Sequence, residues 1–136
     1  MFMMFLSAFN LLLSRYSGSS DVVVGAPIAG RSQEETHESI GYFVNTLALR
    51  VDMSNLTSVA DLLSRVRKCC LDGYSHADVP FHDVVDSMVI QRDSSYSPVF
   101  QAMFTLLDDG TESGCGRVAL CRVTDTLMWS WVSVCV

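Results

Sequence analysis

The alternating pattern of residues 42–51, within the stretch IGYFVNTLALRV, constrains the fold more than any other feature of the sequence. Successive side chains of an extended strand point to opposite faces of a sheet. One face of this predicted strand carries Phe43, Asn45, Leu47, Leu49 and Val51, and the other carries Tyr42, Val44, Thr46, Ala48 and Arg50. Asn45 therefore lies on the more apolar face. Because a buried unpaired amide costs about 1–3 kcal/mol, the pattern predicts a partner for it: neighbouring backbone, an ordered water or a ligand.

Helices and strands alternate around this strand. The apolar residues 3–15 predict a buried helix that ends before Gly18. Residues 54–74 predict a second helix with Ser58 and Asp61 as a cap, and its apolar face comprises Val59, Leu62, Leu63, Val66, Cys70 and Tyr74. Elsewhere the sequence predicts a strand over 21–30, a polar loop or short helical turn at 31–39, a short helix with Pro80 at its first position, and a last strand over 99–107.

Composition excludes several classes of function. The net charge of −6 and the scattered basic residues argue against a nucleic-acid partner. The five cysteines are odd in number and lack zinc-type spacing, so neither a disulfide framework nor a metal site is expected, and a cytoplasmic, reduced chain is favoured. The N-terminal apolar stretch is too short to span a membrane and lacks the features of a signal peptide, so no membrane partner is expected.

The histidines give only weak signals for catalysis. His37 and His82 lie in polar or amphipathic stretches and are expected at the surface. His76 is close to Asp78 in the sequence, and such a pair is more often structural than an acid/base couple. No serine-nucleophile elbow, phosphate loop, dinucleotide fingerprint or zinc-protease motif occurs.

Four stretches, in the same order, resemble the condensation domain of non-ribosomal peptide synthetases. They are FNLLLSRYSGSSDVVVGAPIAGRS, IGYFVNTLALR, SHADVPFHDVVD and RDSSYSPVFQAMFTL. The resemblance covers about residues 5–107. It implies an α/β (α+β) fold, the C-terminal lobe of a chloramphenicol-acetyltransferase-like domain, with a small mixed sheet and packed helices.

The resemblance also implies a chemistry. Members of the family join a thioester to an amine as an amide, and both substrates arrive on the phosphopantetheine of carrier protein domains; no cofactor is bound directly. The family's His-His-x-x-x-Asp-Gly motif is absent from these residues. We therefore expect a fragment that lacks its N-terminal lobe, has no catalytic residue of its own and is inactive alone, which leaves its status as an enzyme open. The alternatives are a related acyltransferase fragment or a non-catalytic module that docks carrier proteins.

The motif residues are the candidates for the substrate tunnel. These candidates are Asn45, Thr46, His76, Asp78, Arg92 and Asp93. For each of them a structural role, such as a loop-fixing hydrogen bond or ion pair, is the alternative. Residues 1–107 are assigned to the partial condensation domain, and residues 108–136 form a tail without family similarity. A truncated gene product, a misjoined exon or a frameshift would each account for such a tail.

Overall fold

The computed structural model of the chain describes residues 1–31, 33–88, 99–107, 117–122 and 134–135. In chain order the elements are α1 (Phe2–Ser17), β1 (Asp21–Ile28), the 3-10 helix η1 (Glu34–Thr36), β2 (Asn45–Asp52), α2 (Val59–Ser75), α3 (Phe81–Ser87), β3 (Ala102–Leu107), β4 (Arg117–Arg122) and β5 (Val134–Cys135). The α/β character predicted for the chain is confirmed. The strand predicted over residues 42–51 is β2, which lies at one edge of the sheet and begins at Asn45, three residues later than Tyr42.

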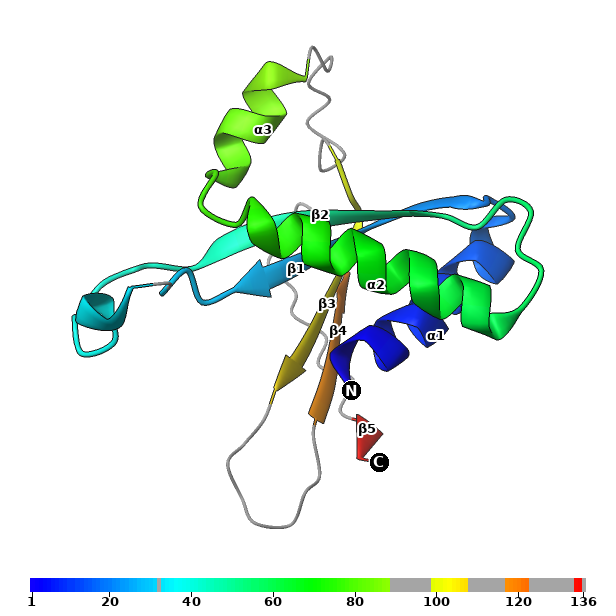
Figure 1. Cartoon of the computed structure of the whole chain (residues 1–136), viewed down its shortest axis with the longest axis horizontal. Helices are drawn as coiled ribbons and strands as arrows, with labels where there is room; N and C mark the ends of the chain where they lie inside the picture. The colour runs from blue at the N-terminus through cyan, green and yellow to red at the C-terminus, as the bar shows by residue number, and fades with distance from the viewer. Residues whose placement is uncertain (32, 89–98, 108–116, 123–133, 136) are drawn as a thin grey trace.

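The five strands form one mixed sheet in the order β2-β1-β3-β4-β5 (Figure 1). β1 pairs with β2 in antiparallel fashion and with β3 in parallel, and β4 is antiparallel to both β3 and β5. β4 and β5 fall within residues 108–136, the part of the chain assigned from its sequence to a tail without family similarity. The sheet is therefore small and mixed, as expected.

The core lies between one face of the sheet and the two long helices. In the β1/β2 ladder, Val22 faces Val51, Val24 faces Leu49 and Ala26 faces Leu47. All six of these side chains are buried, and they share one cluster with Leu6 of α1 and with Leu62, Val66 and Cys70 of α2. Phe104 of β3 joins them, with its ring centroid 5.3 Å from that of Phe2 and 5.6 Å from that of Phe9. Burial of the valine, leucine and phenylalanine side chains of this cluster contributes about 1.5–3 kcal/mol each.

Two expectations about the helices were wrong in detail. α1 is buried along one side only, because Leu6 is covered while Met4 and Leu12 remain 63% and 48% exposed. On α2 the buried positions are Leu62, Val66 and Cys70, whereas Val59 of the predicted apolar face is 71% exposed in the first turn. In the described part of the chain, no helix combines the length and the apolar character needed to cross a membrane.

The helix ends follow the local sequence signals. Gly18 follows α1 with a φ of 69°, and its N–H donates a hydrogen bond to the Ser14 carbonyl. This is the left-handed helix ending that glycine favours. The Ser58 hydroxyl accepts the Asp61 N–H at 3.2 Å, so the predicted cap of α2 is confirmed. Pro80 is the residue just before α3 and not its first helical position, because its ψ of 139° is extended.

Candidate functional site

Asn45, the first residue of β2, joins that strand to the segment that leads into α3. Its Nδ2 donates hydrogen bonds to the carbonyls of Ala77 at 2.9 Å and Val79 at 2.8 Å. Its Oδ1 accepts the N–H of Phe81 at 3.1 Å and of Thr46 at 2.9 Å. An amide side chain has two donor hydrogens and two acceptor lone pairs. All four are used, so Asn45 acts by holding the 77–81 segment and has no capacity left for a ligand.

A hollow of about 530 Å³ lies beside this network, and we call it the Asn45 hollow. It is lined by Gly30, Tyr42, Phe43, Val44, Asn45, Thr46, Ala77, Asp78, Pro80, Phe81 and His82. The structure thus brings three of the six sequence candidates, Asn45, Thr46 and Asp78, to one place. Among the described residues, the Thr46 hydroxyl and the Asp78 carboxylate make no hydrogen bond, so both are available to a bound molecule.

The other candidates lie elsewhere. The Nδ1 atom of His76 lies 2.9 Å from both the Asp72 carbonyl and the Ser75 hydroxyl, and no bond joins it to Asp78 among the described residues. His76 therefore closes the end of α2, and the predicted pairing with Asp78 is absent there. Arg92 and Asp93 lie outside the described residues.

His82 was expected at the surface, and the structure adds that it lines the hollow. Its Nε2 lies 3.2 Å from Asp83 Oδ1, and the side chain is 76% exposed. In the sequence, the only sign that His82 could be a site residue is its position directly after the Pro80-Phe81 pair. The hollow itself forms from segments far apart in the sequence, so no local pattern predicts which residues line it.

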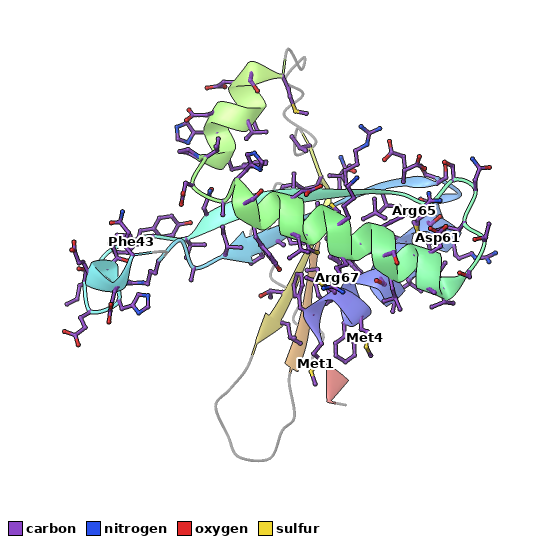
Figure 2. All side chains as sticks on the ribbon, in the orientation of Figure 1. Met1, Met4, Phe43, Asp61, Arg65 and Arg67 are labelled. Carbon is purple, nitrogen blue, oxygen red and sulfur yellow. The ribbon has the colours of Figure 1, made fainter. Side chains whose placement is uncertain are left out.

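The loop between β1 and β2 forms the remaining wall, and Figure 1 shows it extending away from the sheet with η1 near its tip. Gly30 has φ 62°, and a Cβ atom there would lie 1.9 Å from the Phe43 carbonyl oxygen. The Arg31 guanidinium lies over the Phe43 ring at 4.5 Å and donates to the carbonyls of Thr36 and Ser39. Arg31 thus ties the two sides of the loop together and places Phe43, which Figure 2 labels, at the hollow.

The two cysteine thiols of α2 are poor nucleophiles. Burial raises the pKa of Cys70 to about 11, and burial also raises the pKa of Cys69, whose thiol donates to the Arg50 carbonyl at 3.2 Å. Since the thiolate is the reactive form, neither cysteine is a candidate for covalent catalysis. The groups that remain suited to chemistry are the hydroxyl, carboxylate and imidazole at the Asn45 hollow.

Comparisons with known proteins place this geometry in a family. The family model described as "Condensation domain" matches residues 1–114. One of the linear gramicidin synthase polypeptides of Brevibacillus parabrevis is 52% identical over 106 residues, which is 78% of this chain and 1% of that protein. Gramicidin S synthase 2 of Brevibacillus brevis is 42% identical over 113 residues, which is 83% of this chain but 2% of that protein.

A solved structure agrees with these sequence relatives. A four-domain nonribosomal peptide synthetase, bound to AMP and glycine, superimposes with a TM-score of 0.71 and 29% identity, over 74% of this chain and 8% of that one. The chain therefore spans only a few per cent of the length of the synthases that it matches. On its sequence, its fold and the matched family model, the chain belongs to the condensation-domain family of nonribosomal peptide synthetases.

Proposed function

We propose that this chain supplies one wall of a condensation site, in which an amide bond forms between a thioester and an amine. Both substrates would be tethered through phosphopantetheine to carrier protein domains. The observation that carries the proposal is the Asn45 network, which holds the 77–81 segment against β2 beside a hollow of about 530 Å³. The hydroxyl of Thr46 and the carboxylate of Asp78 line that hollow, where they can orient the polar groups of a tethered substrate.

The chain by itself is proposed to be inactive. Its 136 residues contain no His-His-x-x-x-Asp-Gly sequence, the motif expected to act on the attacking amine. Most of the rate of a reaction between two tethered substrates comes from holding them together in the right geometry. One wall of the site cannot hold the two substrates together in the right geometry. A polypeptide segment that carries the motif is therefore needed to complete the site.

The loop between β1 and β2 offers a surface for that segment. Ile40, Tyr42 and Val44 alternate along it and are 104%, 88% and 46% exposed. A row of exposed apolar side chains at every second residue is typical of a surface that another part of a protein covers. We place the contact with the motif-bearing segment along this row, next to the hollow that Tyr42 and Val44 line.

Reconstitution tests the proposal. The chain is mixed with an aminoacyl and a peptidyl carrier protein, alone or after co-expression with a condensation-domain segment that carries the His motif, and amide product is measured by mass spectrometry. We expect product only from the co-expressed pair, and none when the second His of the motif is replaced by Ala. Product from the chain alone would refute the proposal, and so would a co-purified pair that forms none.

A further inference from the structure

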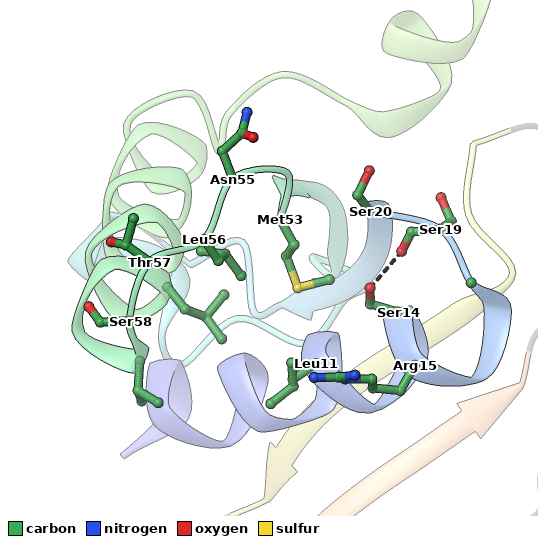
Figure 3. Close-up of a pocket in the computed structure, with 13 residues that line it drawn as sticks. Leu11, Ser14, Arg15, Ser19, Ser20, Met53, Asn55, Leu56, Thr57 and Ser58 are labelled. Atoms are coloured by element: carbon green, nitrogen blue, oxygen red, sulfur yellow. Dashed lines mark hydrogen bonds between the residues drawn. The ribbon is translucent and has the colours of Figure 1, made fainter.

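A second hollow, of about 760 Å³, lies at the opposite end of β2 from Asn45. It is bounded by the C-terminal half of α1, the loop that joins β2 to α2, and the first turn of α2 (Figure 3). We call it the Arg15 hollow, and the lining residues that matter here are Leu11, Arg15, Met53, Leu56, Thr57 and Leu62. None of them belongs to the Asn45 hollow, so this second hollow is a separate feature of the surface.

The Arg15 hollow has an apolar floor. Met53 and Leu62 are 8% and 4% exposed and belong to the core, and Leu56 packs against it. At the two sides, Leu11 and Val59 are 40% and 71% exposed. In the described structure, the hollow is therefore lined by apolar side chains both at its buried floor and at its solvent-exposed sides.

The walls are held in place without a ligand. Arg65 donates to the carbonyls of Asp52 at 3.1 Å and Ser54 at 2.9 Å and forms an ion pair with Asp61 at 3.0 Å, and Figure 2 labels this pair on α2. On the other wall the Ser14 hydroxyl donates to the Ser19 carbonyl at 2.6 Å, the dashed line of Figure 3. A preorganised surface loses little conformational freedom when a partner binds.

Among the described residues that line this hollow, Arg15 alone is charged. Within the described part of the chain its guanidinium makes neither an ion pair nor a hydrogen bond. Figure 3 shows its side chain running beside Leu11, so the cation lies next to apolar surface. In a chain with a net charge of −6, an unpaired cation at an apolar hollow is complementary to a ligand that is both acidic and aliphatic.

We propose that the Arg15 hollow is a docking site for an extended peptide segment that places a carboxylate on Arg15 and aliphatic side chains on Leu11, Met53 and Leu62. A peptide fits better than a small molecule, because a small-molecule site buries most of its ligand's surface. The exposed Leu11 and Val59 show that this hollow is open along its sides, so it covers only one face of a ligand. Extended peptide segments do bind in surface grooves of this open kind. This inference is independent of the proposed amide-forming function.

The test uses the full chain and two probe peptides, acetyl-Ala-Leu-Asp-Leu-Ala-amide and the same peptide with Asn in place of Asp. Amide NMR shifts of the ¹⁵N-labelled chain are followed during titration. We expect the largest shifts at residues 53–59, and the Asp peptide to bind about threefold to fivefold more tightly than the Asn peptide, as one exposed ion pair gives.

Two variants test whether the preference for the Asp peptide comes from Arg15 at the hollow or from general electrostatic attraction to the chain. Arg15→Gln is expected to remove the preference for the Asp peptide while leaving the weaker apolar binding. Arg67→Gln removes the same charge from an exposed position of α2 outside the hollow (labelled in Figure 2) and is expected to leave the preference intact. Shifts that map away from residues 53–59, equal binding of the two peptides, equal effects of the two variants, or no shifts at millimolar peptide would each overturn the proposal.

Discussion

Gly25 of β1 lies directly against the ring of Phe100, and a Cβ atom on Gly25 would come within 2.4 Å of Phe100 Cε2. Phe100 is 5% exposed, and its ring centroid is 5.4 Å from that of Phe81, the first residue of α3. Gly25 alternates with Val24 and Ala26, which face the helices, so Phe100 packs on the opposite face of the sheet. The missing side chain of Gly25 thereby allows Phe100 to connect β1 to the start of α3.

Gly25→Ala should destabilise the chain by about 1–3 kcal/mol, because the added methyl group overlaps an aromatic ring that is already packed. The measurement is the free energy of unfolding in urea. In a Phe100→Leu background the same substitution should cost less, because the shorter side chain leaves room for the methyl group. Equal costs in the two backgrounds would mean that the ring does not limit position 25.

Asn45→Ala should destabilise the chain by about 1–3 kcal/mol, since it leaves the N–H of Phe81 and the carbonyls of Ala77 and Val79 without their partner. Hydrogen exchange at the Phe81 amide should accelerate as well. Thr46→Val is the matched control, because the hydroxyl of Thr46 makes no hydrogen bond among the described residues. Unchanged exchange at Phe81 in Asn45→Ala would contradict the role assigned to Asn45.

The sequence predicted the buried face of β2 well, and the reason is geometric. Side chains of a strand alternate with a period of two, so Leu47, Leu49 and Val51 had to share a face. The same argument required a partner for Asn45. It could not name that partner, because Val79 and Phe81 follow Asn45 by 34 and 36 residues and only the tertiary fold brings them together.

The faces of α1 and the shape of the site were not predictable in this way. α1 is apolar on nearly every side, so its sequence does not reveal that Leu6 is buried while Leu12 is exposed. The Asn45 hollow combines Gly30, Thr46 and His82, which come from three separate segments. The positive φ of Gly30 explains why glycine stands there, but it reports a backbone conformation and not a site.

Asp21 and Arg50 should make stability depend on pH in the acid range. The Arg50 guanidinium donates to both carboxylate oxygens of Asp21, at 2.9 and 2.8 Å, and this hydrogen bonding lowers the pKa of Asp21. A carboxyl whose pKa is lower in the folded state stabilises that state above its unfolded pKa, about 3.9, and loses this contribution as the pH falls through the folded pKa.

The test compares wild type with Asp21→Asn by urea unfolding between about pH 6 and pH 2, across the pKa range of carboxyl groups. Wild type should be the more stable protein at the upper end, and the difference should close as the pH falls. Arg50→Gln should lose the same contribution at neutral pH. A difference that stays constant over the whole range would show that Asp21 acts through something other than its charge.

Asn10 is the least favourable residue of the core. It is completely buried on α1, and neither Nδ2 nor Oδ1 has a hydrogen-bond partner in the described structure. A buried polar group without a partner costs about 1–3 kcal/mol. Asn10→Leu keeps the number of side-chain heavy atoms and the branching at Cγ, removes that cost and has the better helix propensity. We therefore expect this variant to be more stable by about 1–2 kcal/mol, measured as the free energy of unfolding in urea.

Ser7→Ala provides the contrast, since Ser7 is also buried on the same helix but its hydroxyl donates to the Met3 carbonyl at 2.7 Å. Its removal should bring no comparable gain, because no unpaired group is relieved. Asn10→Asp should be much less stable than wild type, because it buries a charge without a partner. If Asn10→Leu proved no more stable than wild type, the amide would have to be satisfied in solution, by a buried water or by a part of the chain beyond the described residues.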